Sequence, residues 1–91
     1  MRNAYLEVTY RHGKAVAAYY YLPRIPGQRS VRTRRVEACL LIDFANDGRV
    51  IGIEITAPSV LSLTMFNRVL RELGISRVRR REIAPMITAW T

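Results

Sequence analysis

Hydrophobic and polar positions alternate most clearly between Cys39 and Ser59, in the stretch CLLIDFANDGRVIGIEITAPS. On each side of Asp47-Gly48, apolar residues stand at every second position: Leu40, Ile42 and Phe44 before it, and Ile51, Ile53 and Ile55 after it. Alternation with a period of two is typical of β-strands that bury one face. The stretch therefore predicts a β-hairpin whose apolar side chains share one face.

The length of the hairpin loop decides which residues lie opposite one another. A two-residue loop at Asp47-Gly48 suits a type I′ turn, in which both central residues have positive φ. We predict this loop, which gives the pairs Asn46–Arg49, Phe44–Ile51, Ile42–Ile53 and Leu40–Ile55. A three-residue loop would set Phe44 opposite Val50. It would also set Ile42 opposite Gly52, which is a poorer apolar match.

Two more strands are predicted near the start of the chain. Residues 4–10 alternate, and the polar residues 11–14 include a glycine and should turn the chain. Residues 15–22 contain three consecutive tyrosines, which project to both faces and favour a central or doubly covered strand. The arginine-rich residues 24–35 leave two alternatives open. They form either a long mobile loop or the start of the third strand, running from Val31 toward Val36.

One amphipathic helix is predicted from Ser59 to Leu73, because apolar residues recur there at helical spacing. Ser59 is a good N-cap, since its hydroxyl can accept from a free N–H of the first turn. Arg68 and Arg71 suit the negative end of the helix dipole. Gly74 is a natural residue to end the helix in the left-handed conformation.

The predicted fold class is α+β: a four-stranded antiparallel sheet of two hairpins, followed by one amphipathic helix on one face. Residues 1–74 are expected to form this domain. Residues 75–91 form a basic and apolar C-terminal extension, ISRVRRREIAPMITAWT, with no clear period. Because an exposed apolar tail is costly, we expect it to pack on the sheet or on a second subunit.

Composition is consistent with a single small domain and a cytoplasmic location. No apolar run approaches the roughly 18 residues of a membrane helix, and the N-terminus lacks the apolar block of a secretory signal. The one cysteine, Cys39, has no partner for an internal disulfide and is expected to be a buried thiol.

The charge balance is strongly basic, with 15 Lys+Arg against 7 Asp+Glu and a net charge of +8. One interpretation is a polyanion or an acidic protein as partner. The other is a surface that is merely soluble in an arginine-rich chain. If the partner is RNA or DNA, the candidate contacts are Arg29, Arg32, Arg34, Arg35, Arg77, Arg79, Arg80 and Arg81.

The segment from Asp43 to Ser59, DFANDGRVIGIEITAPS, resembles the hairpin D-Y-D-x-D-G-R-L-V-G-I-E-I-L-x-A-S of the YuzE-like family of small bacterial proteins, a domain of unknown function. The resemblance extends more weakly back to Tyr5 and is carried mainly by residues 34–59. It implies a small α+β fold with an antiparallel sheet and implies no activity. The second acidic position of the motif is Ala45 here, so any acidic cluster at this hairpin has one carboxylate fewer than in the family.

The clustered carboxylates have a structural and a functional interpretation. Asp43 and Glu54 should share the face opposite the isoleucines, where Gly52 leaves room beside Asp43 for a ligand or a cation. The alternative, which we favour, is that both pair with arginines such as Arg49, while Asp47 serves the turn. His12 has no second histidine or cysteine pair nearby in the sequence, and is interpreted as a turn residue. We predict neither an enzyme nor a cofactor or metal.

Three functions remain open at the level of sequence. The first is a non-catalytic homo-oligomeric interaction module, with Tyr19, Tyr20, Tyr21, Met86 and Trp90 as candidate interface residues. The second is a nucleic-acid-binding protein that uses the arginines, with Tyr5, Tyr19 and Tyr21 as a stacking platform. The third is a ligand or cation site at Asp43 and Glu54.

Overall fold

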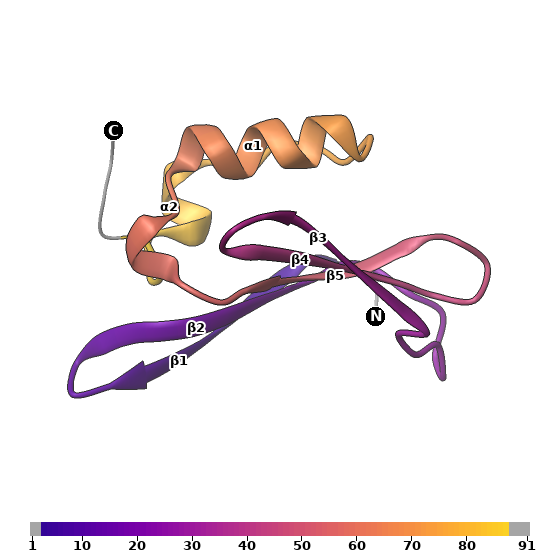
Figure 1. Ribbon diagram of the computed structural model, residues 1–91, viewed down its shortest axis with the longest axis horizontal. Coiled ribbons are helices and arrows are strands. Elements are labelled where there is room, and N and C mark those ends of the chain that lie inside the picture. The colour runs from indigo at the N-terminus through magenta and orange to yellow at the C-terminus, as the bar shows by residue number, and fades with distance from the viewer. Residues whose placement is uncertain (1–2, 88–91) are drawn as a thin grey trace.

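A computed structural model describes residues 3–87 and shows a five-stranded antiparallel sheet in the order β1-β2-β5-β4-β3 (Figure 1). The strands are β1 (Tyr5–Arg11), β2 (Lys14–Tyr21), β3 (Arg32–Glu37), β4 (Leu40–Phe44) and β5 (Val50–Ile55). A short 3₁₀ turn, η1 (Pro58–Val60), leads to the helices α1 (Leu63–Glu72) and α2 (Arg80–Ile83). Both helices lie over the same face of the sheet. The α+β class with an antiparallel sheet is therefore confirmed.

The predicted number of four strands is wrong, because the arginine-rich segment supplies a fifth strand, β3. Its pairing with β4 is extended by the Val31 N–H, which donates to the Phe44 carbonyl at 2.9 Å. Arg32 to Arg35 are all exposed, since β3 is an edge strand. An edge strand that buries so little does not need alternating apolar residues, so its sequence resembles that of a loop.

The β4–β5 connection is a three-residue loop, so the predicted two-residue loop is wrong. Ala45 N–H donates to the Arg49 carbonyl and Gly48 N–H to the Ala45 carbonyl, both at 2.9 Å. In this geometry positive φ is needed only at Gly48, which has φ of 85°. The Asp47 side chain accepts from the Arg49 N–H at 3.0 Å and stabilises the turn.

A β-bulge restores the apolar register beyond this loop. Phe44 lies opposite Val50, and the next pair is Asp43 with Gly52, so Ile51 is the extra residue of β5. The predicted pairs Ile42–Ile53 and Leu40–Ile55 are therefore confirmed. The predicted pairs Phe44–Ile51 and Asn46–Arg49 are wrong, since Arg49 pairs with Ala45. One inserted residue changes the register by one position, which compensates for the longer loop.

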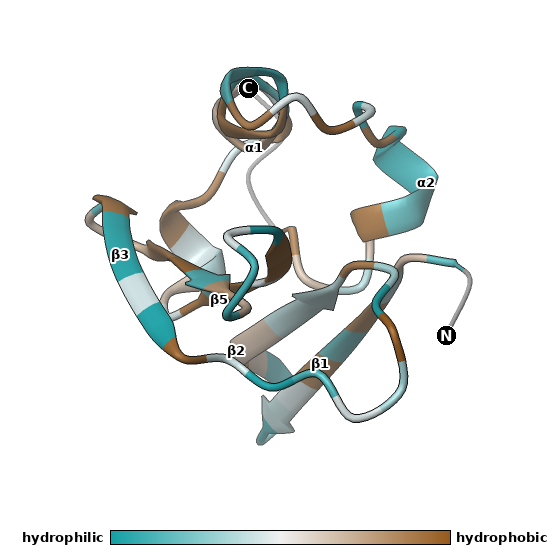
Figure 2. Ribbon diagram, turned by 90° about the vertical axis from the view of Figure 1, so that its right-hand side faces the viewer, coloured by the Kyte–Doolittle hydropathy of each residue, from teal (hydrophilic) through white to brown (hydrophobic). Residues whose placement is uncertain are grey.

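The core lies between the sheet and the helices, where Figure 2 shows the apolar segments turned inward. Phe66, Val69 and Leu70 of α1 are buried in the same cluster as Ile53 and Ile55 of β5. Residues 75–87 join this core as well, through the buried side chains of Val78, Ile83, Met86 and Ile87. The described part of the C-terminal extension thus packs within its own chain, and includes a second short helix where none was predicted.

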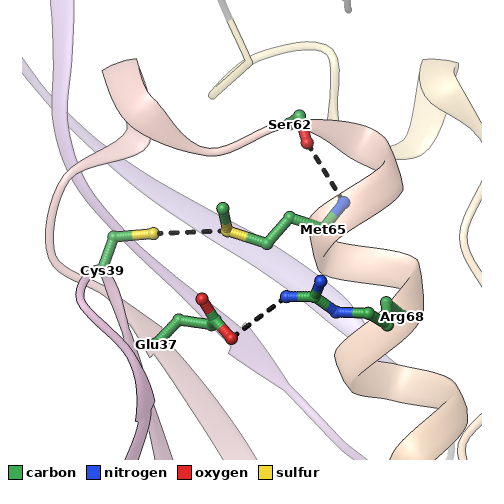
Figure 3. Close-up of polar contacts among 5 residues, drawn as sticks. All are labelled: Glu37, Cys39, Ser62, Met65 and Arg68. Carbon is green, nitrogen blue, oxygen red and sulfur yellow. Dashed lines mark hydrogen bonds and ion pairs between the residues drawn. The ribbon is translucent and has the colours of Figure 1, made fainter.

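The helix begins three residues later than predicted, with Ser62 rather than Ser59 as its N-cap (Figure 3). The Ser62 hydroxyl accepts from the Met65 N–H at 3.1 Å, while Ser59 is exposed and makes no cap hydrogen bond. The reason is Leu61, whose backbone is extended and whose side chain is fully buried. Burying Leu61 interrupts the helical pattern, and α1 starts after it.

Gly74 ends the helix as predicted. It has φ of 73°, and its N–H donates to the Arg71 carbonyl at 3.0 Å. The Ile75 N–H donates to the Leu70 carbonyl at 2.8 Å, which completes a Schellman motif. The chain reverses here, so that residues 75–78 return alongside α1 (Figure 1).

The two serines make a direct comparison possible. Ser62→Ala should lower the free energy of unfolding by about 0.5–2 kcal/mol, because it leaves an N–H of the first turn without its partner. Ser59→Ala should change stability by only a few tenths of a kcal/mol, since the residue is exposed and caps nothing. Urea denaturation of both variants checks this; a larger loss for Ser59→Ala would contradict the observed helix start.

Candidate nucleic-acid interface

The face of the sheet opposite the helices, which we call the open face, carries a row of tyrosines from β1 and β2. The Tyr5 and Tyr21 rings are stacked, with centroids 4.5 Å apart and planes inclined by 13°. The ring of Tyr19, two residues before Tyr21 on β2, is also 4.5 Å from the Tyr21 ring, with the planes inclined by 51°. The Arg24 guanidinium lies 5.6 Å from the centre of the Tyr21 ring. The rings thus contact mainly one another, and Tyr5 at the sheet edge is 48% exposed.

The ring of Tyr19 occupies the space above Gly52. A Cβ atom at this position would overlap the hydroxyl and ring of Tyr19, so no larger residue fits while the ring stays there. Gly52 lies beside Asp43 and Glu54 beside Leu41, as predicted. However, the room that glycine leaves is filled by a side chain of the same chain and not by a ligand.

Asp43 is the one buried carboxylate among the described residues, and both its oxygens have partners. The Tyr19 hydroxyl donates to one oxygen at 2.6 Å, and the Thr33 hydroxyl donates to the other at 2.5 Å. These bonds join β2, β4 and β3 across the open face. Within residues 3–87, no three His, Cys, Asp or Glu side chains come close enough to hold a metal ion. The geometry therefore supports the structural interpretation of Asp43, although with tyrosine and threonine as partners and not an arginine.

The same contact changes the acidity of Tyr19. Burial of its hydroxyl, followed by the hydrogen bond to the Asp43 carboxylate, raises the pKa of Tyr19 well above its usual value. Arg24 lowers it, but by less. The phenol is therefore a hydrogen-bond donor and stays protonated throughout the neutral pH range.

The structure also places the other turn and interface residues that the sequence analysis named. His12 and Gly13 both have positive φ, 52° and 76°, and form the β1–β2 turn.

Tyr20 faces the core, where its ring meets Phe66 edge-on at 5.5 Å, and Met86 is fully buried. Neither Tyr20 nor Met86 is available for a subunit interface, whereas Trp90 lies outside the described residues. Cys39 is buried, as predicted, with its sulfur 3.9 Å from that of Met65 (Figure 3).

Most carboxylates of the chain are engaged within the fold. Glu7 accepts from the Tyr21 hydroxyl at 3.3 Å, and Glu82 accepts from the Arg79 N–H at 3.1 Å. Asp47 accepts from the Gln28 side chain at 3.1 Å as well as from its own turn. The negative charges of the fold are thus largely used to hold turns, strands and a helix end.

The arginines are used differently. In the part of the chain that the structure describes, one ion pair forms, between Arg68 and Glu37 at 3.0 Å (Figure 3). Arg32 and Arg34 of β3 lie over the ring of Phe44, 4.5 and 5.3 Å from its centre, and Arg35 donates to the Ala38 carbonyl. All eight candidate arginines are exposed, namely Arg29, Arg32, Arg34, Arg35, Arg77, Arg79, Arg80 and Arg81.

A groove of about 790 Å³ runs between α1 and residues 74–77. Arg68, Arg71 and Arg77 line it, together with apolar surface from Leu63 and Ile75, and none of its lining residues is acidic. We call it the α1 groove. Arg68 is paired with Glu37, but Arg71 and Arg77 make no ion pair within residues 3–87, and their two positive charges favour an anionic ligand.

The wall of the α1 groove is held in place by Asn67. Its side-chain amide donates to the Val78 carbonyl at 3.0 Å, and its oxygen accepts from the Val78 N–H at 2.8 Å. Together with the reversal at Gly74, this fixes the returning segment beside the helix. The sequence shows the three arginines, but it cannot show that the reversal brings Arg77 next to Arg71.

Comparisons with known proteins add no relative. No family model, no curated protein and no solved structure matches this chain. Membership of the YuzE-like family therefore stays a prediction. None of the helices in residues 3–87 is both long and apolar enough to span a membrane.

A double-mutant cycle tests the contact between Tyr19 and Gly52. Gly52→Ala should lower the free energy of unfolding by roughly 1–3 kcal/mol, because the methyl group forces the Tyr19 ring to move. In a Tyr19→Ala background the same change should cost little or nothing, since the space is then free. Equal costs in the two backgrounds, measured by urea denaturation, would rule out the contact.

Alkaline pH should weaken the fold through Tyr19. The pKa of Tyr19 is raised in the folded state. The contribution of the protonated Tyr19 side chain to the free energy of unfolding is therefore fully present below the unfolded pKa of about 10, and it is lost progressively as the pH rises above that value. The free energy of unfolding should therefore fall more steeply above pH 10 in the wild type than in Tyr19→Phe. If the free energy of unfolding falls equally with pH in the wild type and in Tyr19→Phe, the raised pKa of Tyr19 is contradicted.

Proposed function

We propose that this protein is a non-catalytic nucleic-acid-binding module whose α1 groove and β3 arginines bind phosphate groups. The observation that carries the proposal is the unequal use of charge. Most carboxylates are engaged within the fold, whereas the exposed arginines of β3 and of the groove, apart from Arg68, make no ion pair within residues 3–87. Positive charge that no carboxylate of the fold neutralises is available to a polyanion.

The positions of the arginines support a continuous contact of one nucleic-acid strand with the α1 groove and with β3. Arg68 lines the α1 groove and also pairs with Glu37 at the end of β3. This pair connects the helix to the edge strand, and α1 lies above β3 on the same side of the sheet (Figure 1). The α1 groove also has the volume of an ordinary small-ligand site, so it can admit a nucleotide unit of a longer strand.

The chemistry of these groups favours binding over catalysis. Guanidinium groups fit phosphate oxygens with two parallel hydrogen bonds, but they stay protonated at neutral pH and so cannot act as general bases. The tyrosines of the open face already stack on one another. Phosphate contacts should therefore dominate, and binding should depend strongly on salt and weakly on sequence. A cytoplasmic location would be compatible with such a partner.

The first of the sequence-based functions, a homo-oligomeric module, loses part of its basis. It depended on an apolar tail and on aromatic residues that need a second chain. Tyr20 and Met86 are instead buried in their own chain. Self-association would have to use another surface.

The proposal is tested by fluorescence anisotropy with a labelled mixed-sequence single-stranded oligonucleotide across a range of salt. Wild type should bind at low salt, and Arg71→Gln with Arg77→Gln should weaken binding by on the order of tenfold or more. The slope of log affinity against log salt should decrease by about 1.4 if two phosphate contacts to the single strand are lost.

The matched control is Lys14→Gln with Arg49→Gln, which removes the same charge at the β1–β2 turn and the β4–β5 turn. This variant should keep most of the affinity. An equal loss in both double variants would show that net charge alone drives binding, and no binding of the wild type at low salt would end the proposal.

A further inference from the structure

The two edge strands of the sheet are protected to very different degrees. An edge strand presents unpaired N–H and C=O groups, which charged side chains or proline usually shield from other chains. At one edge, β3 carries Arg32, Arg34 and Arg35. At the other edge, β1 reads YLEVTYR, with no proline and with its single basic residue at the last position.

The side chains of β1 alternate regularly between the two faces. The bulge in its pairing with β2 lies in β2, where Val16 is the extra residue between the partners of Thr9 and Tyr10. Glu7, Thr9 and Arg11 therefore lie on the open face. Val8 lies on the core side, as does Tyr10, whose hydroxyl donates to the Pro85 carbonyl at 2.7 Å.

We propose that β1 pairs antiparallel with β1 of a second copy of this chain, about a two-fold axis that passes through Thr9. This arrangement places Glu7 opposite Arg11 of the other copy, and by symmetry does so twice. It also places Val8 opposite Tyr10 twice, on the core side. Oppositely charged and apolar pairs directly across two strands each stabilise the pairing.

Neighbouring registers lack this complementarity. An axis at Glu7 brings two like charges directly opposite each other, which is unfavourable. An axis at Val8 sets Glu7 against Thr9, and an axis at Tyr10 sets Arg11 against Thr9. Of these registers, the one at Thr9 pairs both charges of the strand, and because one strand supplies both signs, a second copy is a suitable partner.

The surroundings of β1 are compatible with this pairing. β1 is an edge strand of the sheet, and the turn end of the β1–β2 hairpin projects beyond the other strands (Figure 1). Pairing would join two five-stranded sheets into one, with the arginine-bearing β3 at each outer edge. The proposed phosphate sites would then lie far from the dimer axis, so this inference stands independently of the proposed function.

Charge reversal tests the register. Light scattering should give the wild type a mass of twice 10.5 kDa at sufficient concentration. Glu7→Arg and Arg11→Glu should each weaken the dimer by roughly tenfold or more, because both ion pairs become like-charge pairs. The double variant, with both changes, should restore it. Arg35→Glu on the opposite edge is the matched control and should leave the dimer unchanged.

Each other outcome overturns the proposal. A wild type that stays monomeric at all concentrations shows that β1 does not pair. A dimer that neither single change weakens uses another surface. If both single changes weaken the dimer and the double variant fails to restore it, the register is wrong. Far-ultraviolet circular dichroism of each variant confirms that the comparison is made between folded chains.

Discussion

Strand β5 has to pair along both its edges and pack on both its faces, and the rest of the fold depends on meeting these demands together. Its edges bind β2 and β4. On the core side, Ile53 and Ile55 are fully buried with the residues of α1. On the open side, Gly52 lets the Tyr19 ring cross the strand and reach Asp43. One strand of alternating isoleucine and small or polar residues thus joins the two hairpins and the helix.

The parts of the fold that could be predicted are those set by a strong periodic pattern. The hairpin from Leu40 to Ile55 and the body of the helix bury one face each, so their apolar period is visible in the sequence. The predictions that failed concern segments where burial is slight or interrupted. β3 buries little and resembles a loop, and Leu61 inserts into the core and moves the helix start to Ser62. The longer turn at Gly48 was compensated by a bulge, which a pattern of period two does not reveal.

For the candidate site, too, only part could be predicted from the sequence. The arginines and the tyrosines of the open face are visible as residue types, and the neighbours of Asp43 and Glu54 follow from the register. The α1 groove is not visible, because it depends on the reversal at Gly74 and on the two hydrogen bonds that Asn67 makes to Val78. Long-range polar contacts of this kind have no periodic signal, and neither does the engagement of the carboxylates within the fold.

The strand order also has a consequence for the folding of the nascent chain. Each outer hairpin, β1–β2 and β3–β4, is made of segments that are adjacent in sequence and can pair as soon as they leave the ribosome. The strand that joins them, β5, is the last of the five to be synthesised, so for roughly 0.5–2 s the two hairpins have no common sheet. The core closes only when Ile83, Met86 and Ile87 have also emerged. During that interval the apolar faces of both hairpins are exposed, and this is the stage at which the chain is most sensitive to aggregation or to a chaperone.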